Sequence, residues 1–385
     1  MIGAGEGLLL NKGILQQKNL IYLLSILTLW LTIHAVTIQR QERATPFFLL
    51  AAFCVMITLK TKSLLILYSF FELRVVPVCL LILFFGYQPE KLQACFFIVI
   101  YTVVGSLPLL LYIIYNPFRF QTAEILTLAI TLGFMVKTPM YLLHIWLPKA
   151  HVEAPVGGSM ILAGILLKLG SYGLVTFLPY VKINWTLSFY LTLRLLGSII
   201  SSVLCVRRGD IKMLIAYSSV VHIGTVSLGL ISGTELGYSC GVMMIIGHGI
   251  SSPFLFAMAY WLYLSSHSRL LLNNITTWPI IMALFFSLVT LNIGVPPRLC
   301  LWSEVFIAQV IIYLSSFLCP VLVVIFFLGL VYNLHLYVSC VHAKTRINVK
   351  YFDHSSILVT IQSVFLRYNS LFCLDIFHIL KNQSV

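Results

Sequence analysis

Long stretches of apolar residues, separated by short polar gaps, make up most of the chain. A helix needs roughly 20 apolar residues to cross the hydrocarbon core of a bilayer. By this measure the sequence divides into apolar runs near 20–38, 44–59, 63–86, 92–115, 122–147, 155–180, 187–206, 211–232, 236–264, 278–316, 320–341 and 355–380. The pattern predicts an all-α polytopic membrane protein with about 12 transmembrane helices.

Two of these runs carry interruptions. The 278–316 run is too long for one straight span, and Pro296-Pro297 divides it, so we expect two half-helices around an irregular middle. The last run is the weakest, because Arg367 and Asp375 interrupt it. No stretch of soluble character separates the runs, so residues 1–385 are predicted to form a single transmembrane domain.

The composition excludes several classes of protein. Hydrophobic residues make up 60% of the chain and charged residues only 9%, with a mean hydropathy of +1.01. An average soluble chain is about one quarter charged, so a water-soluble enzyme and a disordered protein are excluded. The net charge of +13 does not indicate a nucleic-acid-binding domain, because the basic residues are scattered between the apolar runs and form no patch.

The basic residues in the gaps predict an orientation. We call side A the side of the membrane that holds the loops after the odd-numbered runs. Side A has 11 basic residues: Arg40, Arg43, Lys91, Lys149, Arg207, Arg208, Lys212, Arg269, Lys344, Arg346 and Lys350. The opposite side has 7: Lys12, Lys18, Lys60, Lys62, Arg119, Lys182 and Lys381. The positive-inside rule then predicts that side A faces the cytoplasm or the mitochondrial matrix.

The nine cysteines give no sign of a redox centre. They are scattered, without a CxxC pair, and most lie within apolar runs: Cys54, Cys79, Cys95, Cys205, Cys240, Cys300, Cys319, Cys340 and Cys373. We expect small buried thiols rather than disulfides or an iron–sulfur site. Residues 1–19 contain neither the apolar region and cleavage site of a signal peptide nor an Arg/Ser-rich transit pattern.

Six ionisable residues lie within apolar runs, at positions expected to be deep in the membrane: Glu72, Lys137, Lys168, His222, His248 and Glu304. A charge at the centre of a bilayer costs about 2.5–3.5 kcal/mol on insertion scales. A single lysine or histidine there is often a packed or snorkelling side chain. Six such groups on separate helices instead indicate a hydrated path, because burial brings the pKa values of lysine and glutamate toward each other and makes proton transfer between them less costly.

Residues near these six positions support a polar path. Pro139 and Pro296-Pro297 remove backbone donors and free carbonyls, so the helices broken there need water or polar partners. Glycines at 164, 170 and 173 surround Lys168 and leave room either for water or for close approach of another helix. Arg74 lies two residues after Glu72, on a different helix face, where it pairs with a neighbouring helix or contacts lipid.

Four segments carry a family resemblance. Residues 136–159 read VKTPMYLLHIWLPKAHVEAPVGGS, residues 166–170 LLKLG, residues 86–94 GYQPEKLQA and residues 215–222 IAYSSVVH. Together they resemble the signature of the NADH-ubiquinone oxidoreductase chain 4 family, the antiporter-like membrane subunits of respiratory complex I. The similarity covers residues from about 60 to 340, and its motifs are long and specific.

The resemblance implies two inverted five-helix repeats, each with one broken helix. It implies that Glu72 and Lys137 form the charge pair of a first half-channel and that Lys168 is the central proton carrier. His222 and His248 would be the connecting relay and Glu304 the terminal site of a second half-channel. His144, His151 and Glu153 match the pattern at a loop without a defined role, and Lys149 and Glu153, at i and i+4, are spaced to pair across one helical turn.

The resemblance also implies a location and partners. The chain would be a multi-pass protein of the mitochondrial inner membrane, with its basic loops in the matrix. Its partners would be lipids and other membrane subunits of complex I, including neighbouring antiporter-like subunits, and not nucleic acid. It would be a subunit of an H⁺-translocating NADH:ubiquinone reductase that performs no redox chemistry itself. NADH, FMN, iron–sulfur clusters and ubiquinone would all be bound by other subunits.

The chain departs from the family at its ends. The resemblance implies 14 helices in typical members, of which this chain is expected to lack the first two, so residues 1–19 are expected to be atypical, and the regions before 60 and after 340 match poorly. Two alternatives to a complex I subunit remain open at this stage. One is a subunit of an Mrp-type cation/proton antiporter, and the other is a structural assembly subunit without transport. The six buried ionisable residues argue against the second, since a scaffold does not need them.

Overall fold

The computed structural model describes residues 2–39, 42–86, 88–115, 124–177, 185–271, 279–296 and 299–341. Within these ranges every regular secondary-structure element is a helix, and the only β-type pairing is an isolated bridge between Asp210 and Leu270. In the same ranges nine helical segments are long and apolar enough to cross a membrane, and two shorter apolar helices accompany them. The predicted all-α polytopic membrane class is confirmed. The predicted run 355–380 lies outside the described residues.

The helices follow the predicted runs closely. In chain order they are α1 (Ile2–Gln39), α2 (Thr45–Lys60), α3 (Leu64–Leu73), α4 (Val75–Phe85), α5 (Lys91–Tyr115), α6 (Glu124–Lys137), α7 (Trp146–Glu153), α8 (Val156–Ile161), the π-helical turn η2 (Leu162–Leu166), α9 (Leu167–Phe177), α10 (Trp185–Arg207), α11 (Ile211–Ile231), α12 (Glu235–Ser266), α13 (Pro279–Ile293), α14 (Leu299–Leu314) and α15 (Cys319–Val341). Helix α1 begins far before the predicted residue 20, because no proline interrupts residues 2–39.

Two helices are broken within the bundle. The run 122–147 does not form one helix: α6 ends at Lys137, before Pro139, and α7 begins only at Trp146. Leu142 between them has a φ of 77°, a conformation that a branched side chain adopts rarely. The second break, between α13 and α14, confirms the expected pair of half-helices, and Gly294 supplies the positive φ of 76° there.

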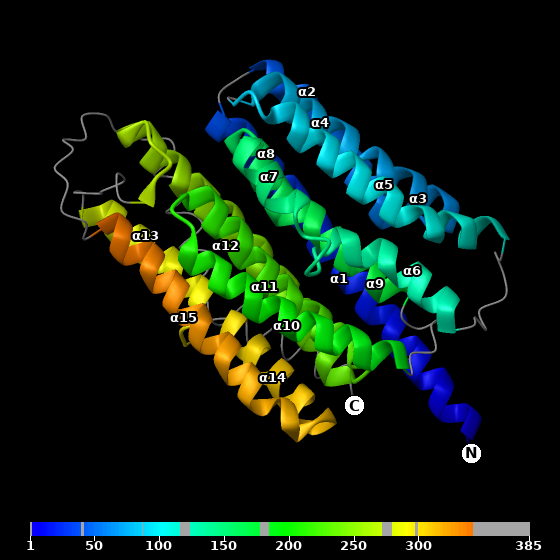
Figure 1. Ribbon diagram of the computed structural model, residues 1–385. Coiled ribbons are helices and arrows are strands. Elements are labelled where there is room, and N and C mark those ends of the chain that lie inside the picture. The colour runs from blue at the N-terminus through cyan, green and yellow to red at the C-terminus, as the bar shows by residue number, and fades with distance from the viewer. Residues whose placement is uncertain are drawn as a thin grey trace.

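The helical units fall into two consecutive groups of five. The first group is α2, α3–α4, α5, α6–α7 and α8–η2–α9, and the second is α10, α11, α12, α13–α14 and α15. In each group the fourth unit is the broken one, which is the arrangement expected from the resemblance. Figure 1 shows the helices as long, roughly aligned rows, with α2 to α5 at one edge and α13 to α15 at the other.

The centre of the bundle is formed by α8–η2–α9, α11 and α12. The apolar windows of the spans at 156–177 and 211–231 are each 94% buried, whereas that of the span at 316–341 is only 22% buried. Helix α1 packs against α8, α2 and α12. The ionisable residues expected at membrane depth are therefore carried mainly by helices that other helices surround.

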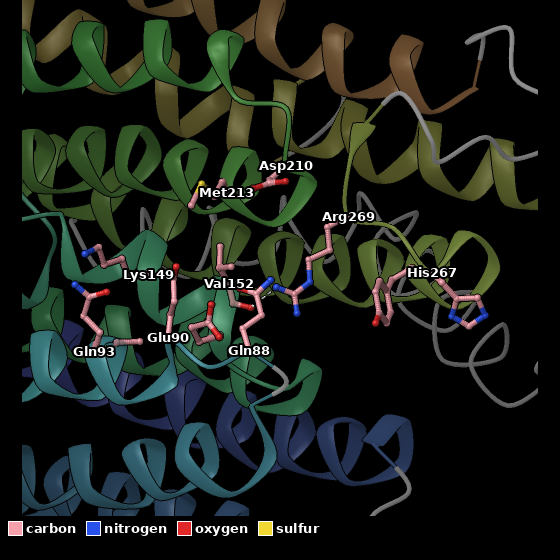
Figure 2. A pocket seen from close by; sticks show the side chains of 12 residues that line it. Gln88, Glu90, Gln93, Lys149, Val152, Asp210, Met213, His267 and Arg269 are labelled. Atoms are coloured by element: carbon pink, nitrogen blue, oxygen red, sulfur yellow. Dashed lines mark hydrogen bonds between the residues drawn. The ribbon is translucent and has the colours of Figure 1, made fainter.

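Among the described residues, parts of three loops assigned to side A lie together. A common pocket of about 580 Å³ is lined by Lys149, Asp210 and Arg269 (Figure 2). Each of these residues follows an odd-numbered run in the sequence. Lys212, which we expected in the loop, instead lies in the first turn of α11, where it is buried and its Nζ donates to the carbonyl of Ala154 at 3.1 Å. This common pocket agrees with the predicted side A.

Candidate functional site

Glu72 and Lys137 form a buried ion pair. Glu72 lies in the last turn of α3 and Lys137 is the last residue of α6. The Lys137 Nζ donates to Glu72 Oε1 and, at 3.4 Å, to the carbonyl of Phe71, and it lies 3.6 Å from the centre of the Phe71 ring. A cation is favourable at this position because the C-terminus of a helix carries partial negative charge.

Arg74 contacts the same residue, Phe71, that Lys137 contacts. It separates α3 from α4, is buried, and donates through Nε to the carbonyl of Phe71 at 3.0 Å. Its guanidinium carbon lies 4.2 Å from the centre of the Phe71 ring. Contact with lipid, one of the two possibilities for Arg74, is therefore wrong, and no acidic partner for it is present among the described residues.

Lys168 and His248 form the central contact of the site. The Lys168 Nζ donates to the carbonyl of Ala163 and lies 2.8 Å from His248 Nδ1. Ala163 belongs to the π-helical turn η2, whose wider hydrogen-bonding pattern leaves a carbonyl available to a side chain. Only 2% of either residue is exposed, so neither group is in contact with bulk water.

The glycines around Lys168 allow close helix approach. A Cβ on Gly170 would lie 2.7 Å from Thr138 Cγ2, and one on Gly249 would lie 3.5 Å from the carbonyl oxygen of Gly164. Of the two possibilities, water or close packing, the structure supports packing at Gly164 and Gly170. This packing brings the end of α6 and the middle of α12 next to the helix that carries Lys168.

His222 connects three side chains from separate helices. Its Nδ1 lies 3.1 Å from Glu304 Oε1, and its Nε2 lies 3.3 Å from the hydroxyl of Tyr332 on α15. The rings of His222 and His248 are 5.3 Å apart between centroids. Lys168, His248, His222 and Glu304 thus form one continuous series of neighbours across α9, α12, α11 and α14.

A cavity of about 410 Å³ adjoins the end of this series. Its lining combines the break between α13 and α14 with side chains of α11 and α15, and includes His222, Asn292, Gly294, Glu304 and Tyr332. The Asn292 amide donates to Asn333 Oδ1 at 3.0 Å, so the wall of this cavity is polar beyond the ionisable groups. Water in such a cavity would reach Glu304 directly.

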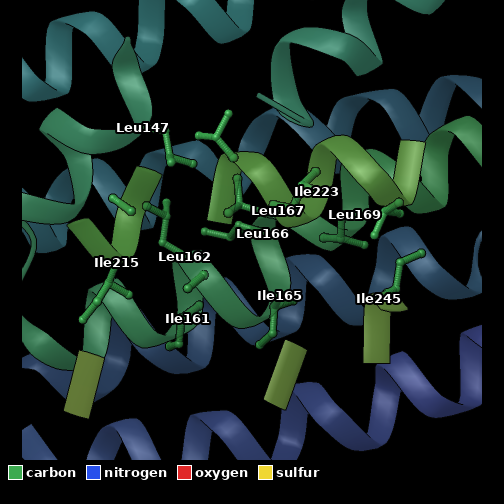
Figure 3. Close-up of a cluster of buried hydrophobic side chains, with 14 of the residues drawn as sticks. Leu147, Ile161, Leu162, Ile165, Leu166, Leu167, Leu169, Ile215, Ile223 and Ile245 are labelled. Atoms are coloured by element: carbon green, nitrogen blue, oxygen red, sulfur yellow. The ribbon is translucent and has the colours of Figure 1, made fainter. Parts of the chain in front are cut away.

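Lys137 and Lys168 are not in contact. A small cavity of about 30 Å³ adjoins Lys137, and Arg74, Thr102, Trp146, Leu162 and Leu166 are among its other lining residues. A space of this size holds one or two water molecules. Figure 3 shows Leu162, Ile165 and Leu166 of η2 within the surrounding apolar cluster. The structure thus brings the six predicted residues together as two groups: Glu72 with Lys137, and Lys168, His248, His222 and Glu304.

The side-A pocket joins residues of the family motif to loop residues. With its amide oriented to satisfy both neighbours, Gln88 donates to Glu153 Oε1 at 2.6 Å and accepts from Arg269 at 3.3 Å. Burial raises the pKa of the Glu153 carboxyl, and the nearby Arg269 opposes that rise. The spacing-based pairing of Lys149 with Glu153 is wrong, because Lys149 Nζ lies 3.9 Å from the centre of the Phe97 ring instead.

The two histidines of the motif are buried beside aromatic rings. His144 stacks on Tyr141 at 5.3 Å between ring centroids, and His151 stacks on Phe256 at 4.5 Å. Among the described residues neither ring nitrogen of His151 has a hydrogen-bond partner. Their contacts are therefore those of packed aromatic residues.

Two buried polar residues in or beside the site were not predicted from the sequence, namely Arg194 and Tyr332. Arg194 is a charge inside the apolar run 187–206 and could have been found by the criterion that found Glu72 and Lys168. Tyr332 is one of 19 tyrosines, and nothing in its sequence surroundings distinguishes it.

Metal-binding chemistry finds no support in the described part of the chain, where no group of three His, Cys, Asp or Glu side chains could hold a metal ion. The eight cysteines in that part are free thiols, and Cys373 lies outside it.

Comparison with known proteins gives consistent similarities. Residues 61–330 match the family model described as NADH:quinone oxidoreductase/Mrp antiporter, transmembrane. A protein of Albinaria caerulea named NADH-ubiquinone oxidoreductase chain 4 is 36% identical over 350 residues, which is 84% of this chain and 79% of that protein. Its namesake from Ceratitis capitata is 39% identical over 319 residues, covering 78% of this chain and 71% of that protein.

Solved structures share the fold at lower identity. A chain of respiratory complex I from Thermus thermophilus with bound NADH superposes with a TM-score of 0.83 at 22% identity, covering 91% of this chain and 80% of that one. A chain of the Mrp complex from Dietzia sp. DQ12-45-1b gives a TM-score of 0.79 at 15% identity, covering 93% and 82%.

Proposed function

The chain belongs to the NADH:quinone oxidoreductase/Mrp antiporter membrane family, and from that membership we propose that it is the chain 4 proton-translocating subunit of NADH-ubiquinone oxidoreductase, respiratory complex I. Relatives that carry this name are 36% and 39% identical over most of the chain. The observation that carries the proposal is the buried series Lys168, His248, His222 and Glu304, in which each residue neighbours the next.

The proposed route begins at the Glu72–Lys137 pair. A proton on Lys137 is held by Glu72 and by the Phe71 carbonyl, and weakening of the Glu72 contact releases it. The small cavity next to Lys137 gives room for the water that carries the proton toward Lys168.

Lys168 passes the proton onward. Its Nζ is 2.8 Å from His248 Nδ1, so a lysine ammonium donates directly to a neutral imidazole. His248 and His222 are separated by 5.3 Å between ring centroids, which a bound water or a ring rotation bridges. His222 then delivers the proton to Glu304, beside the cavity at the second helix break.

Proton movement and electron transfer belong to different subunits in this proposal. This chain moves protons through its own side chains and contributes no redox group, and NADH, FMN, iron–sulfur clusters and ubiquinone belong to other subunits. Its partners are the other membrane subunits of complex I, including neighbouring antiporter-like subunits, and lipids. Many large apolar side chains are exposed on the outer helices, such as Phe84, Leu111 and Phe327, and these suit contact with lipid or with another membrane subunit.

The location follows from the same membership. We place the chain in the mitochondrial inner membrane as a multi-pass protein, with the basic loops of side A in the matrix. An Mrp-type antiporter subunit shares the fold, but the likeness to the Mrp structure is at 15% identity, below the 36–39% shared with chain 4 relatives. A purely structural subunit does not explain why a buried lysine–glutamate pair and a buried histidine–glutamate contact occupy its interior.

One experiment tests the proposal with a matched control. The native complex is purified and its subunits are identified by mass spectrometry. NADH-driven proton uptake is then measured in vesicles that contain the complex with either Glu304→Gln or Glu235→Gln in this chain. Glu235 is an exposed acid at the start of α12, outside the series. We expect Glu304→Gln to lower pumping by roughly tenfold or more, since it removes one partner of a buried pair, and Glu235→Gln to have no effect. Pumping at the wild-type rate in assembled Glu304→Gln enzyme would refute the route, and copurification with antiporter subunits alone would refute the complex I assignment.

A further inference from the structure

Arg194 is a buried cation that the proposed route does not use. It lies on α10, inside the membrane span at 189–207, and only 2% of its surface is exposed. It takes part in neither of the two ion pairs formed among the described residues. A permanently charged side chain without an acid, deep in a membrane bundle, is costly unless its surroundings supply several acceptors.

The acceptors of Arg194 all belong to the end of α6 and the break that follows it. Its Nη2 donates to Thr138 Oγ1 at 2.7 Å and contacts Met135 Sδ at 2.9 Å, and its Nη1 donates to the carbonyl of Pro139 at 3.4 Å. Thr138 directly follows Lys137 in the chain. The guanidinium therefore binds both sides of the point at which the helix stops.

A second contact joins α10 to the same break. A Cβ on Gly197 would lie 2.5 Å from Tyr141 Cβ, so the α10 backbone lies directly against the break. On its other side Thr138 faces Gly170 of α9, and its hydroxyl also bonds the carbonyl of Phe134 at 3.0 Å. Thr138 is thus fixed between α9 and Arg194.

The chemistry of the break explains why an arginine suits this position. Pro139 cannot continue the helical ladder, and the last carbonyls of α6 lack intrahelical partners in a medium without water. The guanidinium carries five N–H donors in a fixed plane, so it can bind a hydroxyl and a carbonyl together, which a single ammonium does less well. Its positive charge also complements the C-terminal end of α6.

We propose that Arg194 is a positioning residue for proton transfer, which fixes the end of α6 through Thr138 and Pro139 and so keeps Lys137 directed at Glu72 and at the small cavity that Lys137 lines. The inference rests on the proposed function, because it assigns Arg194 a task within that route. Arg194 does not itself carry the proton, since guanidinium stays charged in proteins.

The test compares Arg194→Gln and Arg194→Lys in the assembled complex, with Ser198→Ala as the control. Ser198 is buried one turn further along α10, and among the described residues its hydroxyl bonds only the carbonyl of Leu195 on the same helix. The readout is protons moved per NADH oxidised, which does not depend on how much complex assembles. We expect roughly a tenfold loss for Arg194→Gln, the scale of one lost charge-assisted hydrogen bond. Arg194→Lys keeps the charge and one contact and should recover most of that loss, and Ser198→Ala should match wild type.

Thr138→Val serves as the independent variant, since it removes the hydroxyl acceptor while Arg194 stays. We expect a smaller loss than for Arg194→Gln, and the double variant should be no worse than Arg194→Gln alone, because both changes remove one interaction. A normal proton ratio in Arg194→Gln, or an Arg194→Lys variant no better than Arg194→Gln, would overturn the inference. If Glu304→Gln also pumped normally, the proposed function itself would fail, so the two failures are distinguishable.

Discussion

Each of the six ionisable residues on the proposed route has a polar partner in the bundle. Removing one member of a buried pair leaves the other charge without compensation, which costs about 3–5 kcal/mol. The pairs therefore respond strongly when a neighbour changes its charge. Lys137, held by Glu72 on α3 and by a carbonyl of the same helix, is the clearest example.

The first prediction at the residue scale concerns Glu72→Gln. This change leaves Lys137 as a buried cation without its acid, so Lys137 tends to lose its proton. We expect NADH-driven pumping to fall by roughly tenfold or more, with quinone reduction reduced through coupling and assembly mostly intact. Glu72→Asp keeps the charge on a shorter side chain and should be milder. The measurement is proton uptake in vesicles, normalised to assembled complex, and wild-type uptake in Glu72→Gln would contradict the pairing.

The residues of the route could be predicted from the sequence, and the family resemblance also implied the pairing of Glu72 with Lys137, but the other contacts could not be predicted. A charge within an apolar run is conspicuous, and this criterion identified Glu72, Lys137 and Lys168. Contact between Lys168 and His248 joins positions 80 residues apart and depends on the packing of α9 against α12, which no local pattern encodes. Tyr332 was missed because its role comes only from lying beside His222.

At the scale of elements, proline had different consequences at different positions. Pro108 and Pro253 lie inside the continuous helices α5 and α12, whereas Pro139 follows the end of α6. At the break after α6 a buried guanidinium binds the carbonyl of Pro139 itself, which stabilises the broken conformation there. The sequence shows the proline but not the distant arginine that accompanies it.

The π-helical turn η2 is a second feature that the sequence did not predict. It interrupts the regular pattern between α8 and α9 and presents the carbonyl of Ala163 to Lys168. Gly164 within it lies against α12, where a Cβ would be 2.9 Å from Pro253 Cγ. The apolar run 155–180 predicts a helix but not its π-helical turn, because a change from α- to π-helical hydrogen bonding leaves the apolar pattern unchanged.

At the scale of the whole molecule, the orientation of the bundle can be tested. Arg207, Arg208 and Lys344 lie on side A, which carries the larger share of the basic loop residues. We expect a protease to cleave these loops in inverted inner-membrane vesicles and not in mitoplasts, whose outer surface is the intermembrane face. Cleavage in mitoplasts alone would reverse the assignment.

The proposed route spans the molecule from α3 to α14 and passes through Lys168 at its centre. Lys168 begins the series that ends at Glu304, and in the proposed route it receives the proton from the Glu72–Lys137 pair, beside which the small cavity lies. Two roles are possible for a buried ammonium here. It either takes up and releases a proton in each cycle, or it serves as a fixed positive charge beside His248.

The most direct test of the route is NADH-driven proton pumping in Lys168→Arg and Lys168→Ala, each normalised to assembled complex. Arginine keeps the positive charge but does not release its proton, so a proton carrier fails with either substitution. We predict that both variants assemble and that both pump at roughly one tenth of the wild-type rate or less, the scale expected for a lost proton-transfer group. Near-normal pumping by Lys168→Arg together with loss in Lys168→Ala would show that Lys168 is only a counter-charge and would contradict the route.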